Sequence, residues 1–165
     1  MESPLTPDDL EAYLRAHHIP GEVLRLEQPT PTVAAAAEAV GVSPDAILKT
    51  VVFMAQGEPI LVVARGLARV DRRLLARALG VGRKKVRVAR AEEVLEATGY
   101  PAGAVPPLGH RRALPTFIDR RVLESPIAYA GGGAHNALLR IAPADLLAAT
   151  RANVLDVQQP PAPDS

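Results

Sequence analysis

The residues best suited to chemistry lie in a loop that is rich in both glycine and proline. Residues 98–109 are Thr-Gly-Tyr-Pro-Ala-Gly-Ala-Val-Pro-Pro-Leu-Gly, and residues 114–119 follow as Leu-Pro-Thr-Phe-Ile-Asp. Glycines expose backbone donors and acceptors while prolines stiffen the chain, so such a loop suits a small ligand held by the main chain. A rigid connector between two elements is the alternative. Two further segments, residues 47–53 and 131–135, favour the ligand-binding interpretation.

The sequence offers little support for several kinds of catalysis. It has no cysteine, which removes thiolate nucleophiles, disulfides and cysteine-ligated zinc. It has no Gly-x-Ser-x-Gly segment and no paired His/Asp spacing, so covalent catalysis has little support. His17 and His18 suit the end of a first helix, His110 a solvated loop, and none has a second ligand at metal-binding spacing. We therefore expect neither a metal nor a cofactor.

The formal net charge is only +1, which argues against a polycation that coats nucleic acid indiscriminately. Arginines nevertheless gather between Arg69 and Arg90. They could make bidentate contacts with phosphates, or they could reflect a GC-rich genome, and the sequence leaves both open. A basic leader and a long apolar run are both missing, so we expect a cytoplasmic protein with no membrane contact.

Capping residues and hydrophobic periodicity predict the elements that must position these residues. Helices are predicted over residues 6–17, 32–40, 71–79, 91–98 and 143–150, with a short helical turn at 43–45. Strands are predicted over residues 21–27, 48–55, 59–64, 86–89, 117–122, 127–130 and 138–141. Gln56-Gly57-Glu58 would join the second and third strands as a hairpin, and a turn at 131–136 would join the last two.

Strands that come both in hairpins and separated by helices predict an α+β (mixed α/β) fold. Its mixed sheet is expected to be strongly curved and partly barrel-like, with helices packed outside it. The length suits a single domain over residues 1–157 with one substantial core. The Pro-rich tail, residues 158–165, is predicted to be disordered.

Four ordered blocks of this chain are similar to a known family. They are residues 41–50 (Gly-Val-Ser-Pro-Asp-Ala-Ile-Leu-Lys-Thr), 98–109, 114–119 and 142–146 (Ala-Pro-Ala-Asp-Leu). Together they resemble the YbaK and prolyl-tRNA synthetase editing-domain family, also called the aminoacyl-tRNA synthetase-associated domain, over roughly residues 6–149. The resemblance implies a free-standing aminoacyl-tRNA deacylase that cleaves the ester between a wrongly attached amino acid and the terminal ribose of tRNA.

The resemblance also implies site residues. Lys49 matches the lysine of the family's Lys-Thr segment, and Gly103 and Pro107 match its Gly-x-x-x-Pro loop, which makes these three the candidate catalytic residues. The Lys49 ammonium would meet the phosphate of the terminal adenosine, unless it is only a strand-end lysine that reaches solvent. Backbone groups from Gly103 to Pro107 would hold the ribose and polarise the ester, and a bound water helped by the ribose hydroxyl would attack it.

Further residues become candidates for substrate binding through the same blocks. They are Thr50, Gly99, Tyr100, Leu108, Gly109, Asp119, Gly131, Gly132 and His135. His135 belongs to a Gly-x-x-x-His element that either faces the ligand or lies in an exposed turn. Asp119 either orients Lys49 or a loop amide, or caps the end of its strand.

The implied partner is the acceptor end of aminoacyl-tRNA, with prolyl-tRNA synthetase as a second candidate partner. The expected substrates are Cys- or Ala-tRNA(Pro), because family members similar to this chain act on them. Two alternatives stay open: a non-catalytic tRNA- or synthetase-associated binding module, and a small-molecule binding protein.

Overall fold

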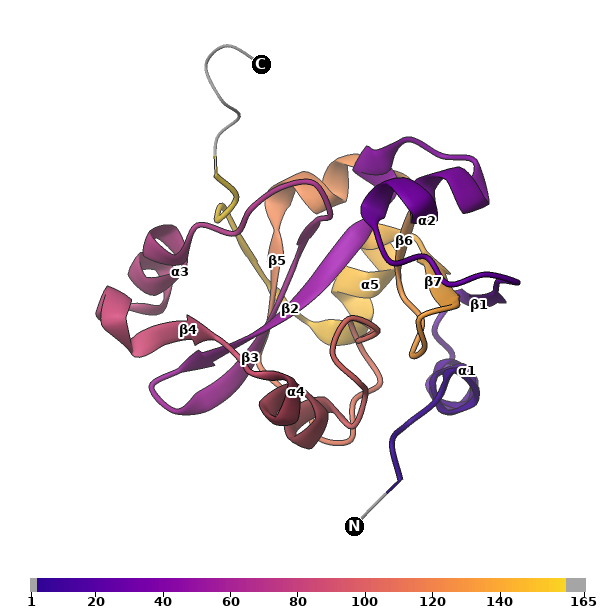
Figure 1. Ribbon diagram of the computed structural model, residues 1–165. Helices are drawn as coiled ribbons and strands as arrows, with labels where there is room; N and C mark the ends of the chain where they lie inside the picture. Colours follow the sequence, from indigo (N-terminus) through magenta and orange to yellow (C-terminus); the bar gives the residue numbers. More distant parts are fainter. Residues whose placement is uncertain (1–2, 160–165) are drawn as a thin grey trace.

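The computed structural model describes residues 3–159, which form helices and strands packed into two sheets (Figure 1). The α-helices are α1 (Pro7–Ala16), α2 (Val33–Val40), α3 (Arg72–Leu79), α4 (Ala91–Thr98) and α5 (Pro143–Thr150). Short 3-10 helices are η1 (Pro44–Ala46), η2 (Arg83–Lys85) and η3 (Arg120–Glu124). The strands are β1 (Glu22–Arg25), β2 (Leu48–Ala55), β3 (Glu58–Arg65), β4 (Val86–Val88), β5 (Thr116–Asp119), β6 (Ala128–Gly131), β7 (Ala137–Ile141) and β8 (Asn153–Leu155).

The β2–β3 hairpin is the centre of the larger sheet, whose order is β4-β2-β3-β5-β8. Its turn residues Gln56 and Gly57 have φ of 51° and 81°, the left-handed pair that a two-residue hairpin turn requires. β3 has a continuous buried apolar run from Pro59 to Ala64, β2 is apolar from Val51 to Ala55, and Lys49 pairs with Ala64 at the open end of the hairpin. The predicted hairpin is therefore confirmed, with Lys49 near its end.

Parallel pairing extends this sheet on the far side of β3. β5 pairs with β3 and β8 pairs with β5, both in parallel. β8 has no counterpart among the predicted strands. The strand predicted over 117–122 ends at Asp119 instead, because the Asp119 carboxylate accepts the Arg121 amide at 2.9 Å and starts η3.

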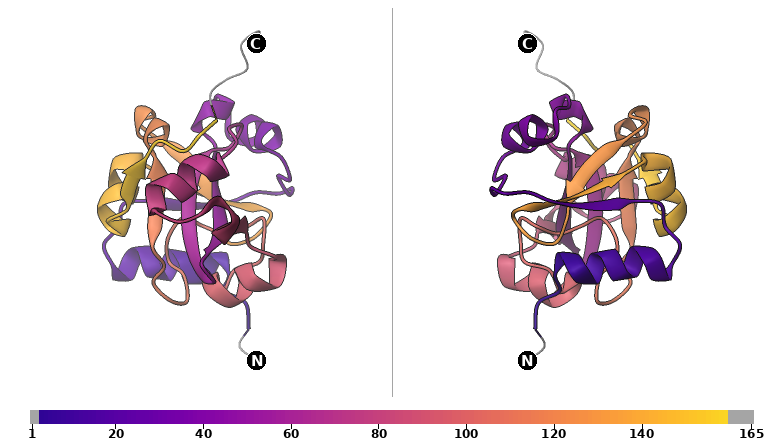
Figure 2. Two further views of the ribbon diagram at one scale, coloured as in Figure 1. Left: turned by 90° about the vertical axis from the view of Figure 1, so that its left-hand side faces the viewer. Right: turned by 90° about the vertical axis from the view of Figure 1, so that its right-hand side faces the viewer.

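The smaller sheet has the order β1-β7-β6 and is antiparallel throughout. It lies beside the start of β2, where Ile47 and Tyr129 form an isolated parallel bridge. α1 runs alongside β1, as the right-hand view of Figure 2 shows, and Arg25 of β1 pairs with Glu11 of α1 at 3.2 Å. The main core lies between the two sheets and includes Leu61, Ile118 and Leu139.

This architecture confirms the mixed α+β class. Neither sheet closes, since no pairing within residues 3–159 joins β4 to β8, so the barrel-like expectation is not confirmed. The predicted tail begins too early: Gln158 is buried and its amide donates to Asp119 Oδ2 at 3.0 Å, while the Gln159 amide donates to Arg69 O at 2.8 Å. Residues 160–165 lie outside the described residues. Among the described helices, none has the length and apolarity that crossing a bilayer requires.

Candidate active site

A pocket of about 220 Å³ opens where the two sheets meet beside α2. Five parts of the chain form its wall: the approach to α2 with the first turn of that helix, the start of β2 with the residue before it, the Gly103–Val105 part of the glycine-proline loop, the end of β6, and β7. The lining residues are Thr30, Pro31, Thr32, Val33, Ala36, Ile47, Leu48, Lys49, Thr50, Gly103, Val105, Ala130, Gly131 and Leu138. The pocket thus brings together Lys49, Thr50, Gly103 and Gly131 of the predicted site.

Lys49 is half-buried at this wall, and its ammonium donates a hydrogen bond to the carbonyl oxygen of Ala68. Burial lowers the pKa of Lys49, because desolvation penalises the charged form, and the positive charge of Arg69 lowers it further. A carbonyl oxygen is a neutral acceptor, so this hydrogen bond does not neutralise the charge of the ammonium.

Gly103 and Gly131 let two stretches of backbone approach each other closely. Gly103 has φ of 86°, and a Cβ on Gly131 would lie 2.4 Å from Val105 O, inside any real contact. The Gly133 amide donates to Ala104 O at 2.9 Å and ties the loop to the end of β6. Only glycine at residue 131 allows the loop to lie where it forms the pocket wall.

His135 lies next to Gly103. A Cβ on Gly103 would be 3.2 Å from His135 Cε1, and the carbonyl oxygen of His135 accepts the Thr30 amide at 3.0 Å. The side chain of His135 is exposed and is not part of the pocket lining. His135 therefore lies in an exposed turn, as one of the two sequence interpretations proposed, but this turn packs beside the loop that lines the pocket.

The Thr50 hydroxyl, in the lining of this pocket, has unused hydrogen-bonding capacity among the described residues. Its Oγ1 is buried and has no hydrogen-bond partner among the described residues. A buried hydroxyl without a partner costs about 1–3 kcal/mol, a cost that a polar ligand group in the pocket would remove.

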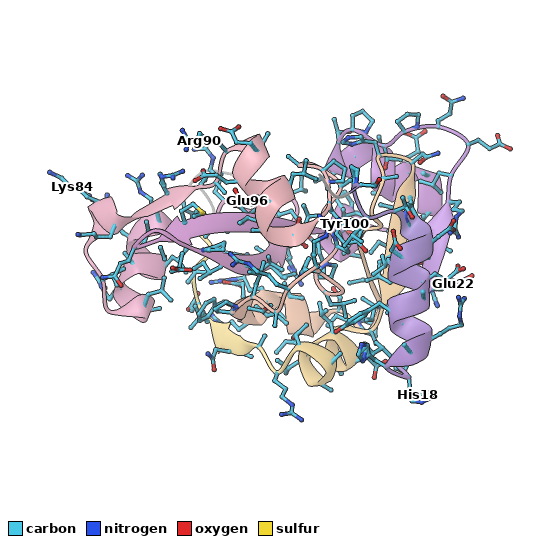
Figure 3. All side chains as sticks on the ribbon, turned by 90° about the horizontal axis from the view of Figure 1, so that it is seen from below. His18, Glu22, Lys84, Arg90, Glu96 and Tyr100 are labelled. Atoms are coloured by element: carbon cyan, nitrogen blue, oxygen red, sulfur yellow. The ribbon has the colours of Figure 1, made fainter. Side chains whose placement is uncertain are left out.

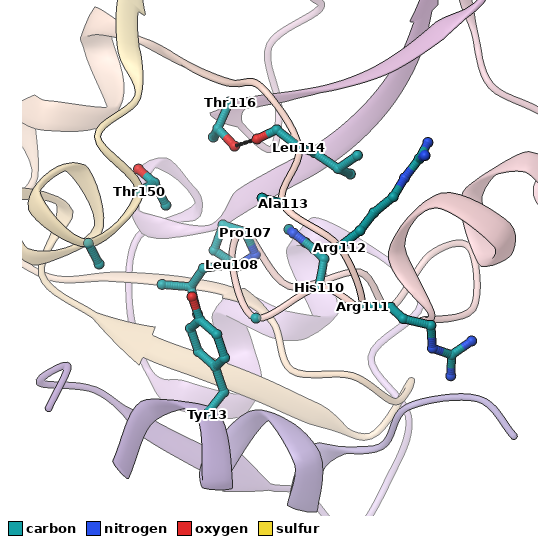
Figure 4. A pocket seen from close by; sticks show the side chains of 12 residues that line it. Tyr13, Pro107, Leu108, His110, Arg111, Arg112, Ala113, Leu114, Thr116 and Thr150 are labelled. Atoms are coloured by element: carbon teal, nitrogen blue, oxygen red, sulfur yellow. Dashed lines mark hydrogen bonds between the residues drawn. The ribbon is translucent and has the colours of Figure 1, made fainter. Parts of the chain in front are cut away.

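Pro107, Leu108 and Gly109 lie elsewhere, in the wall of a second pocket of about 330 Å³ between α1, α5 and the 107–116 segment (Figure 4). His110 also lines it, half-buried rather than solvated, with Nε2 2.7 Å from Pro106 O. Burial lowers the pKa of His110. Hence the loop's first half faces the Lys49 pocket, while its buried second half faces the other pocket.

Three more of the predicted site residues lie outside the lining of both pockets and have contacts that explain them by packing and backbone geometry. Gly99 ends α4 with φ of 85°, and Tyr100 after it is fully buried in the core, at the centre of Figure 3. The Tyr100 hydroxyl has no partner among the described residues, and burial raises its pKa to about 12. Gly132 packs its backbone on Ala137, where a Cβ would lie 2.5 Å from the Ala137 carbonyl carbon.

Asp119 occupies a different part of the fold. Its buried carboxylate accepts the amides of Arg121, Val157 and Gln158 at 2.8–3.0 Å. Within the described part of the chain, neither Lys49 nor an amide of the glycine-proline loop is among its hydrogen-bond partners. These contacts match the strand-end cap that the sequence left open for Asp119.

The approach to α2 contributes lining residues that sequence reasoning missed. Thr30, Pro31 and Thr32 form one rim of the Lys49 pocket, and the Thr32 hydroxyl accepts the Ala35 amide at 3.0 Å as an N-cap. The alternation of Pro and Thr before a helix signals only a cap, so no sequence pattern marks this rim as part of a site. No group of three potential metal ligands occurs among residues 3–159.

The model of the aminoacyl-tRNA editing domain matches residues 27–149, so the chain belongs to this family. The uncharacterized protein YwhH of Bacillus subtilis is 31% identical over 126 residues, 76% of this chain and 78% of YwhH. EbsC of Enterococcus faecalis, named as a candidate Cys-tRNA(Pro)/Cys-tRNA(Cys) deacylase, is 25% identical over 73% of each chain. A crystal structure described as a candidate trans-editing enzyme for prolyl-tRNA synthetase superposes with TM-score 0.85 and 34% identity, covering 93% of this chain and 97% of the other.

Proposed function

We propose that this protein is a trans-editing aminoacyl-tRNA deacylase that hydrolyses the ester of mischarged proline tRNA. The observation that carries the proposal is that Lys49 and Gly103, far apart in the sequence, line one small pocket together with Gly131. Membership of the editing-domain family and the printed descriptions of its relatives support the same reaction.

In this proposal the pocket binds three parts of the substrate, each through different residues. The Lys49 ammonium binds the phosphate of the terminal adenosine, as a point charge that reads no base. The backbone of the Gly103–Val105 segment holds the ribose and the ester. The amino acid side chain lies against the aliphatic lining, which includes Val33, Ile47 and Leu138.

The chemistry is attack by water on the ester carbonyl carbon. The carbon–oxygen bond to the ribose breaks, the ribose oxygen leaves and takes up a proton, and the free amino acid is released. A neighbouring ribose hydroxyl assists, and backbone donors of the loop stabilise the charge that develops on the carbonyl oxygen. Such a site works by positioning, because holding the reacting groups in the right geometry can by itself remove a large part of the activation free energy.

The pocket volume and lining favour a small amino acid, and we propose cysteine or alanine on tRNA(Pro) as the substrates. A methyl or thiol difference changes binding by about 1–3 kcal/mol, so discrimination between the two depends on small details of the wall. The unpaired Thr50 hydroxyl offers one polar contact, to the substrate's amino group or ester.

A deacylation panel tests the proposal. Alanyl, cysteinyl, seryl and prolyl esters are presented on tRNA(Pro) and on their cognate tRNAs, with Lys49→Ala beside the wild type and Arg140→Ala, an exposed cation of β7, as the control. We expect release of alanine or cysteine from tRNA(Pro), loss of most activity in Lys49→Ala, and normal activity in the control. Absence of deacylation by the folded wild type across the panel would refute the function, and full activity of Lys49→Ala would remove Lys49 from the site.

A further inference from the structure

One end of the molecule carries basic side chains that have no acidic partners among the residues that the structure describes. Elsewhere, arginines are often paired: Arg87 and Arg90 both contact Glu93, and Arg120 and Arg121 both contact Asp156. By contrast, within residues 3–159 no ion pair involves the basic residues of the 69–85 segment, all of them exposed. We call this set the basic strip: Arg69, Arg72, Arg73, Arg77, Arg83, Lys84 and Lys85.

The fold places these basic side chains together on the surface, with one acidic residue in the same segment. In α3 the apolar residues Leu75 and Ala76 are buried, while Arg73 and Arg77, one helical turn apart, lie exposed. Asp71 is the one acidic residue in the 69–85 segment, and its Oδ1 accepts the amides of Arg73 and Leu74 as the helix N-cap. The Asp71 carboxylate caps the helix, and seven basic residues against this one acid leave the 69–85 segment strongly positive.

The strip begins beside the Lys49 pocket. The Gly66 amide donates to Ile47 O at 2.7 Å, which holds the start of the 66–71 segment at the pocket wall. The segment then crosses from the end of β3 to α3 (Figure 1). Arg69 within it is close enough to Lys49 to lower its pKa. At the other extreme, Lys84 lies at the end of the molecule opposite His18 of the α1 end (Figure 3).

We propose that the basic strip binds the phosphates of the acceptor stem of the same tRNA whose aminoacylated end enters the Lys49 pocket. This inference rests on the proposed function for the placement of the tRNA end. The charge complementarity is with a polyanion of closely spaced phosphates, because Arg73 and Arg77 lie about one helical turn apart and both are exposed on α3. Arginine forks suit phosphate oxygens, and such contacts position the RNA without reading its sequence.

Separate binding of the stem by the basic strip and of the aminoacylated end by the pocket has a kinetic consequence. Contacts to the stem are equal in the ground state and the transition state, so they lower KM for full tRNA and leave kcat unchanged. The ester of a short 3′ fragment, which has no stem, gains nothing from the strip. Amino acid preference is set in the pocket and does not depend on the strip.

The test compares two charge-matched double variants, Arg73→Ala with Arg77→Ala, and Arg112→Ala with Arg140→Ala, whose arginines are exposed but lie outside the strip. Binding of uncharged tRNA(Pro) is measured by fluorescence anisotropy from about 50 to 200 mM salt, the range over which counterion release dominates. We expect the α3 variant to bind about tenfold or more weakly near 0.1 M salt, and its log K against log salt slope to fall by up to about two units. The control should keep the wild-type slope.

Deacylation assays complete the test and separate it from the proposed function. The α3 variant should raise KM for aminoacyl-tRNA at unchanged kcat, and hydrolyse an aminoacyl trinucleotide like the wild type. Equal slopes for the two variants and the wild type would overturn the strip as an RNA surface, as would equal weakening by both variants. If the wild type cleaves no ester at all, the proposed function fails, while the binding data still decide the strip.

Discussion

Replacing Gly131 by alanine should reduce deacylation about 100-fold in a protein that still folds. The new methyl would lie 2.4 Å from Val105 O, whereas ordinary contact begins at 3.4 Å, so the loop must retreat by about 1 Å. A displacement of about 1 Å in a positioned site costs on the order of 100-fold in rate. The same crowding should lower the free energy of unfolding by about 1–3 kcal/mol, as overpacking does elsewhere.

The assay measures kcat and KM on the best ester of the panel together with thermal unfolding. Gly21→Ala is the matched control, because a Cβ there meets its nearest neighbours at 3.5 Å, in ordinary contact. The loss should appear mainly in kcat, since the loop holds the reacting ester. A folded Gly131→Ala protein that deacylates like the control would refute the idea that the loop's close approach builds the site.

The remaining predictions concern two groups with shifted pKa values. Tyr100→Phe should leave the free energy of unfolding unchanged or raise it by up to about 1 kcal/mol, because it removes a buried hydroxyl with no described partner; chemical denaturation measures this, and a loss above about 1 kcal/mol would reveal a hydrogen bond there. Arg69→Gln should raise the pKa of Lys49 toward its ordinary value of 10.5, since a neighbouring positive charge disappears while burial remains. An NMR titration of the Lys49 side chain follows this shift, and an unchanged or lower pKa would contradict it.

Local signals in the sequence predicted most elements, because capping residues and apolar periodicity act over a few residues. The helix over 91–98 and the strand over 48–55 have the predicted bounds. β8 was missed because it is a short segment, Asn153–Leu155, whose pairing partner β5 is distant in the chain. Non-local parallel pairing leaves no local pattern in so short a strand.

The candidate site was predictable to the extent that short motifs marked it. Lys49 and Gly103 come from such motifs and line one pocket. Pro107 comes from the same motif as Gly103 but lines the other pocket, since spacing in a loop does not fix which way each half turns. Thr30 was missed because its role follows from how the smaller sheet and α2 pack, which only the three-dimensional structure shows.

The parallel pairing of β8 on β5 also determines which fragments of this chain can be soluble. A fragment that ends after α5 would expose β5 as a bare sheet edge, and unpaired edges template association between molecules. It would also leave the Asp119 carboxylate without the amides of Val157 and Gln158, a buried charge with fewer donors. Aggregation of such a fragment would therefore report a missing edge strand rather than a defective catalytic pocket, and expression trials should retain residues through Gln159.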